Sequence, residues 1–215
     1  MPVVAAIAIA AGAVAAVIYL LWPTWRQTGA ADPARIPVSV GGTVFDVPSG
    51  AFRIKVQKHS GPQDRVDLSF QYPSLQPPDA PRRVTADEVD GRLQPIDRIF
   101  LTISAHNGAT APDVRARTIY PRYLDGPAAP AVDGLTLRAF RDGTAYAGED
   151  LATSDAPVLT ACCTRDADTP GMCLSERRID GADLTFRFPR AWLGEWRGVA
   201  SAMDKLSIML RGGER

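Results

Sequence analysis

LTFRFPRAWLGEWRGVASAMDKLSIMLRGG, residues 184–213, contains a strand pattern followed directly by a helix pattern. The first five residues alternate apolar and polar side chains, which is typical of a β-strand with one buried face. Pro189 follows, and proline is tolerated in the first turn of a helix. Apolar side chains then recur at steps of three and four and form one stripe, at Trp192, Trp196, Val199, Met203, Leu206 and Leu210. Gly212 and Gly213 end the predicted helix.

Alternation with a period of two recurs through the chain from residue 36 onward. The clearest pair of predicted strands, residues 36–40 and 43–47, flanks Gly41-Gly42 and should form a hairpin. A two-residue type I′ turn needs positive φ at both central positions, which glycine adopts readily. Further strands are predicted at residues 52–56, 65–72, 99–103, 135–140 and 157–161, and a short helix at residues 113–119. Residues 36–215 therefore predict one α+β domain, mainly antiparallel β, with the C-terminal amphipathic helix packed on the sheet.

The composition excludes several classes of protein. The 215 residues are 46% apolar and 22% charged, with 24 basic and 24 acidic side chains. Such a chain is neither a disordered polyelectrolyte nor a basic nucleic-acid-binding protein. Three cysteines and two histidines are too few for a disulfide scaffold or a metal site with many ligands. We therefore expect no nucleic-acid partner, no metal and no cofactor.

The N-terminal segment carries twenty consecutive uncharged residues, 3–22. A helix of that length spans the hydrocarbon core of a bilayer, roughly 30 Å. Tyr19 and Trp22 lie at its end, where aromatic rings favour the membrane interface. We predict a single-pass transmembrane helix at 3–22 and a tether at 23–35. The alternative is a cleaved signal peptide with its cleavage site near residues 28–30, but the segment lacks a basic start and its apolar run is longer than usual.

The three cysteines bracket one short loop, residues 164–172. Cys173 could form a disulfide with either Cys162 or Cys163. Neighbouring residues of a strand point to opposite faces, so only one of the two has the required Cβ direction. We favour the pair Cys163 and Cys173, and three reduced thiols remain the alternative. Zinc is disfavoured, since the sequence has no CxxC spacing and no second cysteine pair.

The disulfide bears on where the domain lies. Arg26 and Arg35 follow the apolar segment, and a count of basic residues alone would leave the domain in the cytoplasm. Long domains, however, cross membranes largely regardless of charge. A disulfide also suits an oxidising compartment. We therefore expect a bacterial inner-membrane protein with its C-terminal domain in the periplasm.

Two carboxylate pairs could suggest chemistry. Glu149 and Asp150 are neighbours, so on a strand their side chains point to opposite faces. They cannot then act together as general acid and base on one substrate bond, and we interpret them as a surface turn. Asp166 and Asp168 alternate as in a calcium loop, but no bidentate glutamate stands downstream at the offset that such a loop requires. We interpret this loop as a solvated turn.

Neither histidine belongs to a recognisable catalytic motif. His59 and His106 lie in predicted turns, and the sequence contains no Gly-x-Ser-x-Gly elbow and no glycine-rich phosphate loop after a strand. Arginine and tryptophan interleave in residues 187–197, which could stack on a ligand, but core packing of the rings explains the segment better. We therefore nominate no catalytic residue.

Four pieces of the sequence carry a family resemblance: residues 40–48, residues 146–151, Cys163 with Cys173-Leu174, and residues 187–193 with Trp196. Together they resemble inner-membrane-anchored periplasmic proteins of proteobacteria that have no assigned activity. The resemblance extends over most of the predicted domain. It implies a periplasmic address and says nothing of a substrate.

The predicted function is a non-enzymatic interaction protein, bound to the inner membrane through residues 3–22, that binds another envelope protein or a secreted toxin. The alternative is a membrane-tethered periplasmic hydrolase or a small-ligand-binding protein without a recognisable motif. An enzyme should show a deep pocket lined by convergent titratable groups. A binding protein should present a flat surface or an open strand edge.

Overall fold

The computed structural model describes residues 12, 33–79 and 95–212. The chain divides into two units, Met1–Pro33 and Ala34–Arg215. Apart from Gly12 and residues 33–35, the predicted membrane helix at 3–22 and the tether at 23–35 lie outside the described residues. Within the described part of the chain, no helix is both long and apolar enough to cross a membrane.

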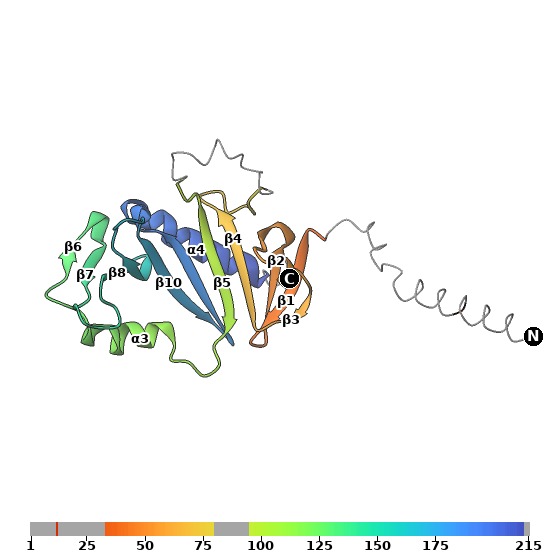
Figure 1. Cartoon of the computed structure of the whole chain (residues 1–215), viewed down its shortest axis with the longest axis horizontal. Helices are drawn as coiled ribbons and strands as arrows, with labels where there is room; N and C mark the ends of the chain where they lie inside the picture. The colour runs from red at the N-terminus through yellow and green to blue at the C-terminus, as the bar shows by residue number, and fades with distance from the viewer. Residues whose placement is uncertain (1–11, 13–32, 80–94, 213–215) are drawn as a thin grey trace, which may run out of the picture. The chain divides into compact units, whose positions relative to one another are not determined.

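The described residues of the second unit form strands, two α-helices and several short 3-10 helices (Figure 1). In chain order these are β1 (Arg35–Val40), β2 (Thr43–Pro48), η2 (Ser49–Ala51), η3 (Lys55–Gln57), β3 (Gly61–Pro62), β4 (Arg65–Gln71), β5 (Arg98–Ala105), α3 (Pro112–Thr118), η4 (Tyr120–Arg122), β6 (Ala129–Pro130), η5 (Val132–Gly134), β7 (Thr136–Ala139), β8 (Glu149–Asp155), β9 (Val158–Thr164), β10 (Met172–Ile179), β11 (Ala182–Pro189), η6 (Arg190–Glu195) and α4 (Trp196–Arg211).

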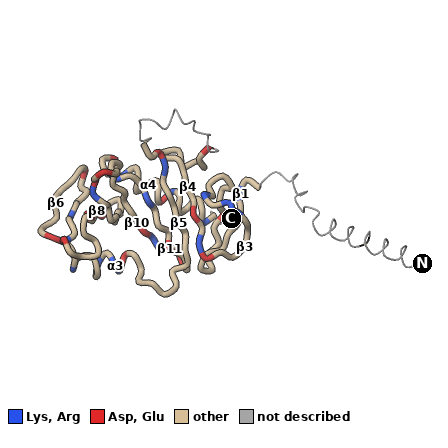
Figure 2. Tube along the Cα trace, viewed as in Figure 1, with Lys and Arg blue, Asp and Glu red and all other residues tan. Residues whose placement is uncertain are grey.

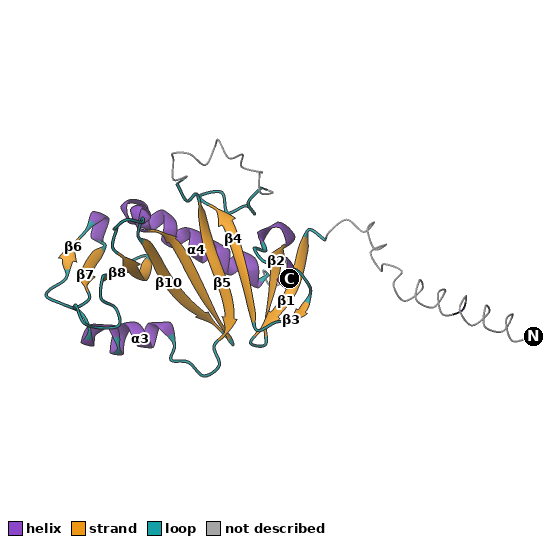
Figure 3. Ribbon diagram, viewed as in Figure 1, coloured by secondary structure: helices purple, strands orange, loops and turns teal. Residues whose placement is uncertain are grey.

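The strands form two sheets. The larger has eight strands in the order β4-β5-β11-β10-β9-β8-β7-β6, and every neighbouring pair is antiparallel. The smaller has the order β2-β1-β3, in which β1 and β2 form the predicted hairpin around Gly41-Gly42. Figure 3 shows α4 running across the large sheet. The predicted α+β architecture, with the C-terminal helix on an antiparallel sheet, is confirmed.

The main core lies between the large sheet, α4 and the small sheet. Alternate residues of the central strands are fully buried, among them Leu101 of β5 and Phe186 of β11, which are register partners. The stripe of α4 packs against them through Val199, Met203, Leu206 and Leu210, all buried. The period of two on the strands and the period near 3.6 on the helix therefore meet in one core.

The strand predicted at residues 52–56 is wrong. The 3-10 turn η2 ends at Ala51 and η3 begins at Lys55, and between them Phe52 makes a single bridge, to Leu68. Phe52 packs against the main core, whereas Ile54 and Val56 are 42% and 79% exposed, so the alternation does not continue along a buried face. Instead the turn delivers the Gln57 side chain to β4, where its Nε2 donates to Asp67 Oδ2 at 3.1 Å and its Oε1 accepts from the Asp67 N–H at 2.8 Å.

The C-terminal helix begins later than its apolar stripe predicts. Residues Arg190–Glu195 form the 3-10 helix η6, and α4 starts at Trp196. A 3-10 helix has about three residues per turn, so Trp192 leaves the stripe. Trp196 is buried, whereas Trp192 is half-buried and stacks on Tyr72 with ring centroids 4.5 Å apart.

Candidate functional site

The large sheet narrows between β9 and β10. Their register has three residue pairs, which join residues 161–163 to residues 173–175. On either side of this joint the ladders are longer, with eight pairs between β10 and β11 and seven between β8 and β9. We call residues 161–163 and 173–175 the neck, because they join two halves of the sheet: β4-β5-β11-β10 and β9-β8-β7-β6.

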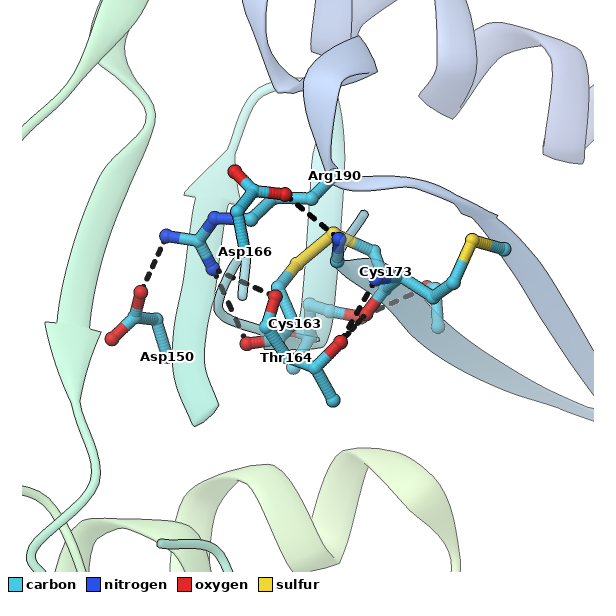
Figure 4. Close-up of a disulfide and its surroundings, with 10 residues drawn as sticks. Asp150, Cys163, Thr164, Asp166, Cys173 and Arg190 are labelled. Atoms are coloured by element: carbon cyan, nitrogen blue, oxygen red, sulfur yellow. Dashed lines mark hydrogen bonds and ion pairs between the residues drawn. A yellow bond between two sulfur atoms is a disulfide. The ribbon is translucent and has the colours of Figure 1, made fainter. Parts of the chain in front are cut away.

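The predicted disulfide reinforces the neck. Cys163 and Cys173 are direct register partners and are bridged (Figure 4). Arg190 Nη1 donates to the Cys163 carbonyl at 3.3 Å, and its Nη2 pairs with Asp150 at 2.5 Å. Arg165 binds the other oxygen of Asp150 at 2.9 Å. The bridge and this arginine pair therefore tie three strands together where the ladder is shortest.

The carboxylates of this region serve the fold. Asp150 is buried in β8 between two arginines, so the surface turn expected for Glu149-Asp150 is wrong: β8 begins there. Asp166 accepts the Gly171 N–H at 2.7 Å and closes the loop after β9, as expected of a turn. Among the described residues, no three His, Cys, Asp or Glu side chains are placed to hold a metal ion.

The two histidines bind the backbone of their own turns. His59 Nδ1 lies 3.0 Å from the Ser60 carbonyl oxygen. His106 Nδ1 accepts the Gly108 N–H at 3.0 Å. These contacts shape two local turns and bring neither ring to the neck.

Beyond the neck, β9 and β10 are no longer paired and a cavity of about 750 Å³ opens between them. Val158 and Thr160 line it from β9, and residues 174–178 line it from β10. Helix α3 contributes from one side and Asp204 of α4 from another. We call this cavity the cleft. At its inner end the Ser175 hydroxyl donates to the Thr160 carbonyl at 2.8 Å, the first contact after the ladder stops.

Both strands turn backbone groups into the cleft. One residue beyond the β10–β11 ladder, the Arg190 N–H donates to the Gly171 carbonyl at 2.8 Å. One residue beyond the β8–β9 ladder, the Arg165 N–H donates to the Gly148 carbonyl at 3.0 Å. In an antiparallel strand the side of the backbone hydrogen bonds alternates from residue to residue. Counting from these bonds, Glu176 and Arg178 present N–H and C=O toward β9, and Val158 and Thr160 present theirs toward β10.

Most charged side chains of the cleft are in ion pairs. Glu176 pairs with Arg115 at 2.6 Å, Arg178 pairs with Asp183 at 2.7 Å, and Arg177 pairs with Asp204 of α4. Burial alone would lower the pKa of Arg115, but the hydrogen bond and the charge of Glu176 outweigh it and raise the pKa. The Arg115 guanidinium therefore stays charged, and the three ion pairs fix the charged side chains of β10 against α3, β11 and α4.

The exposed charge of the cleft is acidic. The side chain of Asp204 is 51% exposed and that of its partner Arg177 is 25% exposed. Asp155, at the end of β8, is exposed as well, and no ion pair of the described residues includes it. Over the rest of the domain basic and acidic residues are interspersed (Figure 2).

Cys162 is the free cysteine and lines the cleft. It lies on the sheet face opposite Cys163, beside a small aromatic cluster that includes Tyr120 and Tyr146. Burial raises the pKa of the Cys162 thiol to about 11. The thiol is therefore protonated at neutral pH, and a thiol is a far weaker nucleophile than a thiolate.

Sequence reasoning missed the cleft because it missed β10. Glu176-Arg177-Arg178 interrupts the apolar alternation that marks a strand, although Cys173 and Ser175 keep it on the buried face. The available signal was the run of three charged residues, 176–178, that follows shortly after Cys173. Such a run on a strand needs ion-pair partners, and these come from α3, β11 and α4.

No known family profile and no curated protein matches the sequence. Two solved structures resemble the fold. One is an immunity protein of the Stenotrophomonas maltophilia type IV secretion system, with a TM-score of 0.53 and 13% identity over 81% of this chain and 92% of that chain. The other is the Neisseria meningitidis iron-regulated outer membrane lipoprotein FrpD, with a TM-score of 0.40 and 10% identity over 72% and 80%. This chain thus shares its fold with the first of them.

Proposed function

We propose that this protein is a membrane-anchored periplasmic binding protein that holds another envelope protein or neutralises a secreted toxin, without catalysing a reaction. The observation that carries the proposal is the cleft, in which two strands present backbone groups that have no ladder partner across the opening. Open strand edges are a recurrent means of binding other proteins. The shared fold with an immunity protein is compatible with this role.

The chemistry of the cleft favours binding over catalysis. Glu176, Arg177 and Arg178 are committed to ion pairs, and the Cys162 thiol is protonated at neutral pH. A general acid or base needs a pKa near the working pH and freedom to exchange its proton. Groups held in ion pairs instead give a fixed, charged surface that a partner protein can recognise.

The location in the cell is the second part of the proposal. Residues 3–22 would form the inner-membrane anchor, residues 23–35 the tether, and residues 36–215 the periplasmic domain. The Cys163–Cys173 disulfide supports an oxidising compartment, where such bonds form and persist. Membrane fractions should contain the full-length protein. A soluble form that starts near Ala31 would contradict the anchor.

A second function is favoured by the size of the cleft. About 750 Å³ falls within the range of small-molecule sites, roughly 300–1,000 Å³. This observation supports the alternative of a tethered hydrolase or a small-ligand-binding protein. If that alternative holds, a small molecule should fill the cleft in the absence of any partner protein.

Photo-crosslinking in intact cells tests the proposed function. A photoreactive amino acid at Val158, which is 70% exposed and lines the cleft, should give a covalent adduct with a protein. The matched control is Val56, which is 79% exposed in η3, away from the cleft, and should give no adduct of that size. Equal labelling at both positions, or no protein adduct at Val158, would contradict a binding protein that uses this cleft.

A further inference from the structure

We infer that the partner inserts an extended segment with basic side chains into the cleft, where it pairs with the open edge of β10 as an added strand. This inference rests on the proposed function and specifies its mode of recognition. Three sets of observations carry it: the direction of the backbone groups, the limits of the cleft and the charge at its mouth.

The backbone of β10 is prepared for an added strand. Residues 176–179 are paired with β11 on one side, in a ladder of eight pairs that fixes their extended conformation. On the other side Glu176 and Arg178 present N–H and C=O groups, and the β9 register stops before them, at Ser175. An incoming strand would therefore meet donors and acceptors already at the spacing of a β-ladder, without ordering the chain first.

The edge of β9 is less suitable. Its unpaired part is three residues, Val158–Thr160, directly after the turn from β8. The Thr160 carbonyl already accepts the Ser175 hydroxyl. That hydrogen bond also closes the inner end of the cleft, so an inserted strand must stop there. Residues 176–179 extend over about 13 Å at roughly 3.3 Å per residue, enough to pair with about four partner residues.

The charge at the mouth selects the side chains of the segment. Asp155 is exposed at the end of β8, and Asp204 is half exposed on α4 although it pairs with Arg177. The side chains of Arg177 and Arg178 are less exposed, at 25% and 23%, so carboxylates make up most of the exposed charge along the cleft. Lysine or arginine on the segment would therefore be favoured over glutamate or aspartate.

The test uses a library of random linear 12-residue peptides displayed on phage and selected on the full-length protein in detergent. Selected peptides are synthesised, and their dissociation constants are compared for Arg178→Pro and Arg178→Ala. Both changes remove the guanidinium, but only proline removes the N–H that faces the cleft. We expect a set of basic peptides whose binding to the Pro variant is at least tenfold weaker than to the Ala variant. A selection that yields no basic peptides with this difference between the Pro and Ala variants would overturn the inference.

Residue-resolved hydrogen exchange on the wild-type protein gives an independent reading, should Arg178→Pro fail to fold. A bound peptide should slow exchange at the amides of Glu176 and Arg178 at least tenfold. The amide of Arg177 faces β11 and should not change. Equal slowing at all three amides would contradict pairing on this edge.

A charge test separates the basic preference from the backbone pairing. Asp155→Asn should weaken the same peptides several-fold, whereas Asp142→Asn, in an exposed turn outside the cleft, is the matched control. An equal effect of both would refute the charge selection. A crosslinked protein at Val158 together with peptides insensitive to Arg178→Pro would leave the proposed function standing and overturn the strand pairing alone.

Discussion

The two halves of the large sheet differ in how they are held. The half β4-β5-β11-β10 has ladders of seven, six and eight pairs, and α4 and the small sheet cover one of its faces. The half β9-β8-β7-β6 has ladders of seven, four and two pairs; it shares the main core through Ala152, Leu159 and Ala161, and a separate cluster of four buried side chains covers its other face. A continuous sheet can therefore combine a rigid half with a less firmly held one. The cleft lies at their junction.

Core truncations should have the largest effects and should show whether the two halves unfold separately. Phe186→Ala in β11 removes a fully buried ring from the main core and should cost about 3–5 kcal/mol of the free energy of unfolding. Phe140→Ala removes a buried ring from the small cluster, where fewer neighbours depend on it. We expect a smaller loss, with faster hydrogen exchange confined to β7 and β8. If both variants unfold globally with equal loss, the two halves are one cooperative unit.

Removal of the disulfide tests how far the neck depends on the bridge between the two halves. The double variant Cys163→Ala with Cys173→Ala opens a loop of sequence separation 10 and should lose about 2–3 kcal/mol in chemical denaturation. The neck then rests on three residue pairs and the arginine contacts of Asp150. Alkylation of the wild-type protein without reductant should find one free cysteine, Cys162. Three free thiols would refute the bridge.

A pH measurement probes the rigid half. Burial would raise the pKa of Asp67, but hydrogen bonds from Arg65, Thr102 and Gln57 outweigh it and lower the pKa to about 2. The folded state therefore binds this proton less readily than the unfolded chain, so the stabilisation is complete above about pH 4 and is lost as pH falls to about 2. It amounts to about 2 kcal/mol. Asp67→Asn should flatten the stability curve over that interval, and an unchanged slope would exclude Asp67 as its source.

The smallest expected effect concerns Trp192. The ring is half-buried and stacks on Tyr72, at the end of the rigid half, whereas Trp196 is buried and donates to the Val132 carbonyl at 3.1 Å. Trp192→Ala should cost about 1–2 kcal/mol, and Trp196→Ala should lower the melting temperature much more. Two variants as stable as the parent would overturn the packing role of both rings and favour a ligand-stacking site.

Local patterns predicted the elements whose periodicity follows burial. The stripe of α4, the hairpin at Gly41-Gly42 and the strand at residues 184–188 all have one face in the main core, so alternation and helical spacing were sufficient. The same rule predicted that only one of Cys162 and Cys163 could pair with Cys173, since neighbours on a strand face opposite ways. At residues 52–56 the rule failed because only Phe52 bridges the sheet, while Ile54 and Val56 are exposed.

The cleft could not be predicted in the same way. It depends on where the β9–β10 register stops, and this follows from contacts between segments far apart in the sequence. Arg115 of α3, Asp183 of β11 and Asp204 of α4 each pair with one of three consecutive residues of β10. No periodicity within β10 encodes these partners. The sequence therefore shows the run of charged residues but not the cleft that they line.

The strand order has a consequence for how the chain is made. β5 pairs with β4 on one side and with β11 on the other, and β11 begins at Ala182, far along the chain from the end of β5 at Ala105. The central sheet therefore cannot close until β11 has been synthesised, and non-local pairing of this kind makes folding slow. We expect refolding of the full-length protein to be rate-limited by docking of β11 and α4, and a truncation before residue 182 to leave no stable sheet.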